Sequence, residues 1–595
     1  FATLLIAPVQ VDIASRRFRV ARRIVVELDR GPMPASTLSS PPRRDRLADA
    51  VGGTIAHGAA QVGWADRSPL TADSTTAEAP SFPAWQFEVD EAGLHRITYA
   101  WADANQAAYP GLLGFLTSHD PRQYSMTVQG TEIPILVQGE ADGSFDPPSA
   151  ERPEGDAIVF YGQPVDGDIL DPDVWQGGDF TDDNVYRLEI AAGPSRVESV
   201  QAAPQGVDPV PPSFPETVRF EPDVRFQGFI SEDGVDHWYD YPWLNTDADV
   251  ETVDWFVPTP GHAGGEVALR ARLHSFTAPD LHRTEILVDD QLVDGCGDGD
   301  NGCVDWDGFR EFTHGVDQGP VTFDKTLSAT TKVTFSIPLG RGVDFDRVMV
   351  NWVELDYDRL YEAGQGRLSF SSANEDRELH VAGFAEAPEI WDLSQTATTA
   401  GGMEVAVPRR MAGVTLVGSE ARFEIAPDPA VPGDRRFAAS SPSAYLTPQL
   451  AREDLPPSTV DSQLGDSLKG TGLGADWIVI GKRELLLSDT GSSLRPQLQT
   501  LVDHRGSQEG QGLQTAVIDV QDVYDEFSYG IEDPEAIRLF LAHAIGDGAP
   551  PCSPGWSPAP SYVLLLGDGA WDYKNNYGYE TPRQLVPTYM FDITA

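Results

Sequence analysis

The sequence predicts a multidomain protein in which all-β domains, a β-domain and a β-sandwich, precede a partial α/β domain with a parallel sheet. A length of 595 residues exceeds the roughly 250 to 300 residues at which a single core stops growing, so about three or four domains are expected. Strand-like runs separated by turns fill the chain up to residue 425. After residue 443, apolar runs alternate with helical patterns.

The first two regions are predicted to be β-rich. Within residues 1–30, "LLIAPVQVDIASRRFRVARRIVVEL" contains strand-like runs, and the following "GPMPASTLSSPPRRD" breaks the pattern and marks a boundary. Residues 80–200 open with "WQFEVDEAGLHRITYA", in which Trp85, Phe87 and Val89 alternate with polar residues. Three further short strands, "GTEIPILV", "DAIVFYG" and "NVYRLEI", indicate an N-terminal β-domain.

A proline-rich linker, 202–216, leads into residues 217–425, which we predict to be a β-sandwich. In "EVALRARLHSF" the apolar residues alternate with arginines, as in a strand with one buried face. "TEILVDDQLV" predicts a hairpin with its turn at Asp289 and Asp290. A second linker is expected over 426–448.

Residues 443–595 follow the order β-α-β-α-β. "DWIVIG", "LQTAVIDV" and "YVLLLG" are the strands, and helices are predicted over 493–505 and 533–545, the second with Asp533 as N-cap and proline at its first position. Near-continuous apolar strands indicate a parallel sheet covered on both faces, whose ligand sites lie beyond the carboxyl ends of its strands. Gly567 and Asp568 follow the third strand and are therefore candidates for an active-site rim, although a strand followed by Gly-Asp-Gly is also typical of a simple turn.

The composition excludes some partners. A net charge of −50, from 92 acidic and 42 basic residues, argues against nucleic acid or an anionic membrane surface and fits divalent cations. No apolar run reaches the roughly 18 residues of a spanning helix. The opening "FATLLIAPVQ" lacks the basic region and apolar core of a signal peptide, and both ends look cut from something longer.

One loop combines carboxylates and glycines in the way a calcium site requires. "VDGCGDGDNGCVDWDG" carries five candidate ligands: Asp294, Asp298, Asp300, Asp305 and Asp307. The spacing does not match an EF-hand. A flexible acidic loop pinned by a disulfide between Cys296 and Cys303 is an equal alternative, so structural calcium is a possibility.

Two motifs together resemble the catalytic domain of the gingipain-type cysteine peptidases. These are "DVYDEFSYGIEDPEAIRLFLAHA", read as an aspartate-rich strand end leading into a helix, and "PSYVLLLGDGAWDYKNN". "ADWIVIG", "LVDHRG" and "LQTAVIDV" extend the resemblance over 443–595. Upstream, "VQVDIASRRFRVARRIVVEL" resembles the closing strands of a pro-segment of that family, and "DEAGLHRITY", "DAIVFYG" and "NVYRL" resemble its β-domain.

The resemblance implies a bacterial enzyme, extracellular or on the cell surface, that hydrolyses protein or peptide substrates with a cysteine-histidine dyad on a caspase-like fold. No cofactor is implied for catalysis. The family places both catalytic residues well downstream of "LLLGD", so they are expected after Ala595, and the catalytic residues stay unknown. His504 and Cys552 are not expected to form the dyad, because a helix end and a strand start meet at the amino edge of a parallel sheet.

Two alternatives remain open. A sortase-like peptidase of the type IX secretion system shares the fold and implies secretion machinery as a partner. A non-catalytic surface adhesin would bind through calcium-stabilised β-modules. Without further strands, the edge strand of the α/β domain is expected to leave backbone groups unpaired and apolar faces uncovered. The chain ending at Ala595 is therefore predicted to have no peptidase activity and a C-terminal domain less stable than its β-modules.

Overall fold

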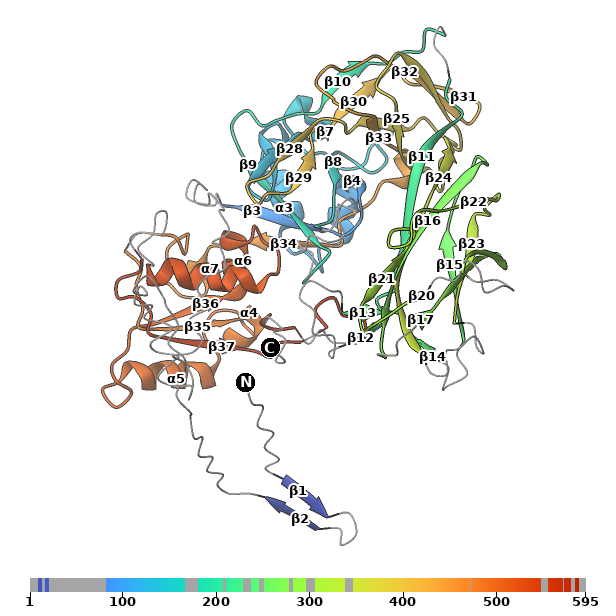
Figure 1. The fold of residues 1–595 in the computed structure, drawn as a ribbon. Coiled ribbons are helices and arrows are strands. Elements are labelled where there is room, and N and C mark those ends of the chain that lie inside the picture. The colour runs from blue at the N-terminus through green and yellow to red at the C-terminus, as the bar shows by residue number, and fades with distance from the viewer. Residues whose placement is uncertain are drawn as a thin grey trace, which may run out of the picture. The chain divides into compact units, whose positions relative to one another are not determined.

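The computed structural model, drawn in Figure 1, describes most of the chain from residue 82 onwards. Its described ranges are 82–165, 180–206, 210–227, 237–245, 251–277, 282–295, 305–337, 346–470, 472–546, 555–570, 572–578 and 584–587, with the backbone of Val9–Asp12 and Arg17–Val20. The chain divides into two compact units, 1–71 and 72–595. In the first unit, β1 (Val9–Asp12) and β2 (Arg17–Val20) form an antiparallel pair.

The N-terminal β-domain contains two sheets and two short helices. The five-stranded sheet runs in the order β34 (Leu450–Asp454), β3 (Ala84–Val89), β9 (Asn184–Ile190), β5 (Tyr124–Val128) and β6 (Thr131–Ile133). The three-stranded sheet runs β4 (Gly93–Thr98), β8 (Ala157–Gly162) and β7 (Leu136–Gln138). The helices are α2 (Tyr99–Ala104) and α3 (Leu112–Ser118). Strand β34, which lies within the range predicted for the α/β domain, is thus the edge strand of this sheet.

The next region is a sandwich of two sheets. The first contains β11 (Ser213–Phe220), β24 (Arg347–Leu360), β16 (Glu266–Ser275) and β21 (Glu311–His314), with β14 (Leu244–Asn245) on β24 and β22 (Val321–Asp324) on β16. The second runs β15 (Thr252–Pro258), β23 (Thr330–Ser336), β18 (Glu285–Val288) and β19 (Gln291–Asp294). Two small ladders pair β12 (Arg225–Phe226) with β13 (Trp238–Tyr239) and β17 (His282–Arg283) with β20 (Asp305–Trp306).

The predicted strand pattern holds in this sandwich. In β16 the alternate residues Val267, Leu269, Ala271 and Leu273 are buried in one shared core. Strands β18 and β19 form the predicted hairpin, and Asp289 and Asp290 adopt the positive φ values, 44° and 66°, that its tight turn requires.

A third β-module has its own core. One sheet runs β10 (Glu198–Gln201), β30 (Arg409–Ala412), β27 (Glu389–Asp392), β33 (Arg435–Ser440) and β25 (Arg367–Ser372). The other runs β26 (Arg377–Val381), β32 (Glu420–Ile425) and β31 (Thr415–Val417), and β28 (Thr396–Thr398) pairs with β29 (Glu404–Ala406).

This module corrects two sequence predictions. The range 217–425 holds two separate apolar cores rather than one sandwich. The stretch 426–448 is not a linker throughout, because β33 within it pairs with both β25 and β27. Prolines lie on both sides of this short strand, with a glycine before it and serines after it, and this composition predicts a loop rather than a strand.

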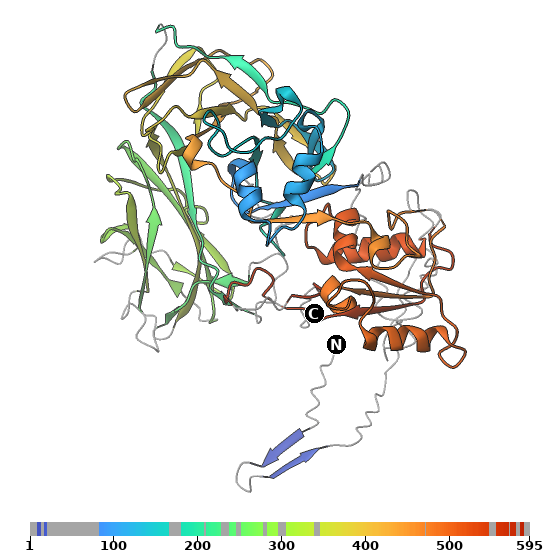
Figure 2. The same cartoon turned by 180° about the vertical axis from the view of Figure 1, so that it is seen from behind.

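The α/β domain confirms the predicted parallel sheet. Strand β35 (Trp477–Gly481) lies between β36 (Thr515–Asp519) and β37 (Tyr562–Leu566), and both neighbours are parallel to it. Its helices are α4 (Arg483–Leu486), α5 (Pro496–Gly506), α6 (Val520–Phe527) and α7 (Pro534–Ile545). Figures 1 and 2 show α6 and α7 on one face of the sheet and α5 on the other, in agreement with the two cores they bury.

Helices α5 and α7 lie where the sequence predicted them, and Asp533 is the N-cap of α7. The aspartate-rich "VYDEFSYG" was wrongly read as a strand end, because helix α6 begins directly after Asp519. In the described part of the chain β37 pairs with one strand only, and Tyr562, Val563 and Leu565 are 53, 41 and 43% exposed. Within the described residues, no helix is long and apolar enough to cross a membrane.

Candidate functional site

The carboxyl ends of the three parallel strands meet at one edge of the sheet. Gly481, the last residue of β35, is in register with Asp519 on one side and Leu566 on the other. Open α/β sheets place their ligand sites at this edge. The residues that follow these strands therefore form the candidate site.

Gly567 and Asp568 lie just beyond the end of β37, as the sequence predicted. Gly567 has φ +146°, and a side chain there would bring its Cβ within 2.7 Å of the Leu585 Cβ, so glycine is required. The Asp568 carbonyl accepts hydrogen bonds from the backbone N–H groups of Leu585 at 2.9 Å and Val586 at 3.2 Å. The chain thereby folds back over the strand end, while the Asp568 side chain stays exposed.

Asp519 connects the sheet edge to helix α6. Its carboxylate caps the helix by accepting from the Gln521 N–H at 3.1 Å, and the Arg483 Nη1 lies 3.7 Å from it. Burial raises the pKa of Asp519, and the Gln521 hydrogen bond and the Arg483 charge oppose that rise. This aspartate terminates the strand and fixes the start of the helix.

Sequence reasoning missed the acidic face of α6. Asp522, Asp525 and Glu526 are all in this helix, and burial is the largest cause that raises the pKa of each of them. The Oδ2 atom of Asp522 is buried and has no hydrogen-bond partner among the described residues. The helical spacing of Asp519 and Asp522 is the signal that could have placed these carboxylates on one face.

The acidic face contacts the N-terminal β-domain. Asp525 accepts hydrogen bonds from the side-chain amides of Gln86 on β3 at 2.9 Å and Gln521 at 2.7 Å. Arg452 of β34 donates to the Gly530 carbonyl at 3.1 Å. Burial raises the pKa of Asp454, also on β34, to about 7, and the Asp525 charge adds to the rise. Hydrogen bonds from Gln86 and Arg452 thus link the two domains beside the carboxylates of Asp525 and Asp454.

The predicted calcium loop lies only partly within the described residues. Cys296, Asp298, Asp300 and Cys303 lie outside them, and of Asp305 only the backbone is described. The structure therefore leaves both the disulfide and the calcium site as predictions.

Two of the predicted ligands can be placed. Asp307 is exposed. The Asp294 Oδ2 lies 2.5 Å from Nδ1 of the buried His314, whose Nε2 lies 2.8 Å from the Thr284 hydroxyl. A calcium ion would have to share Asp294 with this histidine. Among the described residues, no group of three or more His, Cys, Asp or Glu side chains could hold a metal ion.

His504 lies in the last turn of α5, which leads toward the start of β36 and hence to the amino edge of the sheet. Its side chain is exposed. Cys552 lies outside the described residues. The position of His504 agrees with its exclusion from a catalytic dyad.

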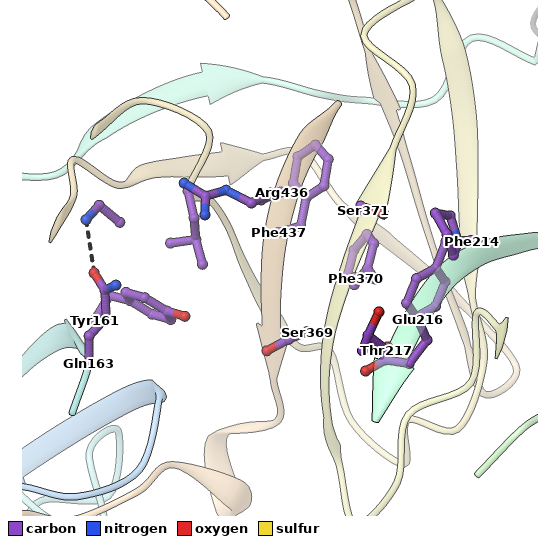
Figure 3. A pocket seen from close by; sticks show the side chains of 13 residues that line it. Tyr161, Gln163, Phe214, Glu216, Thr217, Ser369, Phe370, Ser371, Arg436 and Phe437 are labelled. Atoms are coloured by element: carbon purple, nitrogen blue, oxygen red, sulfur yellow. Dashed lines mark hydrogen bonds between the residues drawn. The ribbon is translucent and has the colours of Figure 1, made fainter. Parts of the chain in front are cut away.

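A pocket lies among the β-modules, away from the α/β domain. Figure 3 shows it between Tyr161 and Arg436 on one side and Glu216 and Thr217 on the other. The cavity measures about 260 Å³. Its walls come from the N-terminal β-domain, the sandwich and the third module.

Comparisons with known proteins find a family model that matches the α/β domain. Residues 472–594 match the model of peptidase family C25, which confirms over this range the resemblance to gingipain-type cysteine peptidases. No curated protein sequence matches the chain.

Among solved structures, the fold is similar to that of dimeric latent PorU from Porphyromonas gingivalis, with a TM-score of 0.54, 14% identity and 87% of this chain covered. The chain spans 45% of the PorU chain. Isomalto-dextranase from Arthrobacter globiformis is also found, at 14% identity over 46% of this chain and 34% of the other, but its TM-score of 0.15 is too low to indicate a shared fold.

Proposed function

We propose that the protein is a bacterial cysteine endopeptidase, secreted or held at the cell surface, that hydrolyses peptide bonds in protein or peptide substrates. The observation that carries the proposal is the peptidase match over residues 472–594, on a parallel sheet whose carboxyl edge ends in Gly567 and Asp568. No cofactor is needed for this chemistry.

The proposed mechanism uses a thiolate nucleophile, a histidine that moves the proton, and backbone N–H groups that stabilise the tetrahedral oxyanion. We place the cysteine and the histidine after Ala595, on further strands of the same sheet. Asp568 would then lie at the rim of the site. The register of Gly481, Asp519 and Leu566 supplies a rigid edge for that site.

The test uses the natural full-length protein and a mixed peptide library, with and without iodoacetamide. We expect cleavage that alkylation abolishes. His504→Gln and Cys552→Ser serve as matched controls, because neither residue belongs to the proposed dyad, and both variants should keep full activity and full sensitivity to alkylation. Loss of activity in either variant would contradict the proposed site, and an inactive full-length protein would favour the adhesin.

A sortase-like peptidase of the type IX secretion system is the second candidate. It is favoured by the extent of the fold similarity to PorU, since 87% of the chain is covered and the β-domains are therefore included. The two candidates differ in the fate of the substrate. Transfer of the acyl group to an added amine such as glycinamide, in place of water, supports the sortase, and hydrolysis alone supports the endopeptidase.

A further inference from the structure

The chain leaves the carboxyl edge of the parallel sheet after Asp568 and returns to it at Leu585. The Leu585 N–H donates to the Asp568 carbonyl at 2.9 Å, and the Ala570 N–H donates to the Gln584 Oε1 at 2.7 Å. These two bonds close the base of a loop. Asp572 follows Asp568 by four residues, so the two lie within about 14 Å of each other. The loop therefore belongs to the edge at which an α/β sheet of this kind binds its ligands.

Residues 572–578 of this loop form a compact turn, which we call the rim segment. Asp572 is 6% exposed, and its carboxylate accepts from the backbone N–H groups of Asn576 at 2.8 Å and Tyr577 at 3.0 Å. Hydrogen bonds to a carboxylate are stronger than those between neutral groups, so Asp572 holds the backbone of the rim segment in one shape. The side chains that this backbone carries therefore start from fixed positions.

The rim segment contacts the N-terminal β-domain at the residues that precede β9. The ring of Tyr573 meets that of Phe180 edge to face, with the centroids 4.6 Å apart and the planes at 70°. The Lys574 Nζ lies 2.6 Å from the Asp182 Oδ1. The side chains of this ion pair are 23 and 51% exposed, so solvent screens their attraction in part. Two neighbouring residues of the rim segment thus bind one short stretch of the β-domain.

A second contact joins the rim segment to the sandwich. The ring centroid of Tyr577 lies 5.7 Å from that of Trp238 on β13, and the Tyr577 hydroxyl accepts from the Phe226 N–H of β12 at 3.4 Å. Trp238 is itself fixed to the sandwich, because its carbonyl accepts from the Nδ2 of Asn351 on β24 at 3.0 Å. The rim segment is therefore held by two different β-modules, both distant from it in sequence.

We propose that the β-modules position the substrate-binding rim of the peptidase site by docking the rim segment. Phe180 and Trp238 are the positioning residues, and they act through Tyr573 and Tyr577. A rim that is already held in place does not have to be ordered when the substrate binds, so docking increases the affinity for substrate. The inference rests on the proposed function, because it assigns the rim segment a role in substrate binding at the same site.

The kinetic test uses the natural full-length protein and a peptide that it cleaves from the mixed library. Trp238→Ala and Tyr577→Ala should each raise KM by about three- to tenfold, the size expected for the loss of one aromatic pair, and leave kcat within about twofold. The double variant should show no further rise, because both residues act through one contact. Phe256→Ala is the control, since Phe256 is a 62% exposed aromatic residue on the second sheet of the sandwich. An unchanged KM in Trp238→Ala, or rises that add in the double variant, would overturn the proposal.

Hydrogen exchange of the rim-segment amides tests the docking independently of activity, at partly exposed positions where the fold is kept. Lys574→Asp sets two negative charges against each other and should speed this exchange by about threefold, the size expected for an exposed ion pair. Adding Asp182→Lys reverses the pair and should restore slow exchange.

Lys332→Asp is the control for the exchange experiment, because it breaks a similar ion pair with Asp290 in the β18–β19 hairpin and should leave the rim segment unchanged. Unchanged exchange in Lys574→Asp, or no restoration by the reversed pair, would overturn the docking. Faster exchange and its restoration in a full-length protein without peptidase activity would instead overturn the proposed function, and with it the role of the rim segment in substrate binding.

Discussion

At the scale of single residues, Asp392 is a fully buried carboxylate whose burial is offset by its neighbours. Burial would raise its pKa, but hydrogen bonds from Arg435 and Ser394 and the charges of Arg435 and Arg409 hold the pKa of Asp392 below its ordinary value. The Arg435 Nη2 lies 2.6 Å from its carboxylate, and Arg409 makes a second ion pair with it. The lowered pKa means that this stabilisation is present at neutral pH and is lost as the pH falls below the ordinary carboxyl range.

Asp392→Ala should destabilise the third β-module by about 3 to 5 kcal/mol, because it leaves the buried Arg435 without its carboxylate partner. Calorimetric unfolding at pH 7 measures the effect. Glu91→Gln is the control, since Glu91 pairs with Arg367 at a surface where its side chain is 56% exposed, and a change below about 1 kcal/mol is expected there. Equal effects of the two substitutions would contradict the assigned role of Asp392.

At the scale of elements, the N-cap of α7 offers a direct test of why this helix begins where it does. The Asp533 carboxylate accepts from the Glu535 N–H at 2.8 Å, and Pro534 occupies the first helical position. Asp533→Ala should cost about 1 kcal/mol, measured as a lower midpoint of urea unfolding of the α/β domain. Asp533→Ser keeps an acceptor and should lose less. An alanine variant as stable as the serine variant would show that the cap contributes nothing.

The contact between α6 and the β-domain should depend on pH. Burial and the Asp525 charge raise the pKa of Asp454 to about 7, above its unfolded value of about 4, so its protonated form is favoured in the folded state. The stabilisation of the folded state by protonated Asp454 is complete below the unfolded pKa of about 4 and is lost as the pH rises through the folded pKa of about 7. Asp525→Asn removes the neighbouring charge. It should reduce the loss of stability between pH 5 and pH 8 by about 1 to 2 kcal/mol.

Differential scanning calorimetry at the two pH values checks this expectation. Asp489→Asn is the control, because it removes one negative charge from a side chain that is 92% exposed and should leave the pH dependence as it is. If both variants change it equally, overall charge rather than the buried contact is responsible.

The elements also show where sequence reasoning succeeds. Helix α7 and the parallel sheet were predicted because cap, proline and apolar spacing agree within short windows. Strand β33 was missed because its residues become a strand only through pairing with β25 and β27. Asp568 could be placed at the sheet edge from strand order alone. The contact of Gln86 with Asp525 spans 439 residues of sequence, and no local pattern reports it.

At the scale of the whole molecule, a net charge of −50 makes self-repulsion a general cost of folding. Any added salt should relieve part of it by screening. A calcium site would add a specific term, because an ion that binds the folded state stabilises it by about 2.7 kcal/mol at a hundredfold excess over its dissociation constant. Screening is expected from any added salt, whereas the calcium effect requires calcium itself and the aspartates of the predicted loop.

We therefore predict that calcium raises the melting temperature of the sandwich more than magnesium chloride does at the same concentration, since the predicted loop supplies many oxygen ligands without the strict octahedral geometry that magnesium demands. Removal of calcium by EGTA should reverse the gain. Asp298→Asn combined with Asp300→Asn should abolish the calcium-specific part and leave the screening part intact. His314→Gln tests whether His314 competes with calcium for Asp294, since the His314 Nδ1 lies 2.5 Å from the Asp294 Oδ2. The replacement should free the Asp294 carboxylate and tighten calcium binding. Equal shifts with calcium and magnesium in every variant would mean that the acidic loop is a charged surface and not a site.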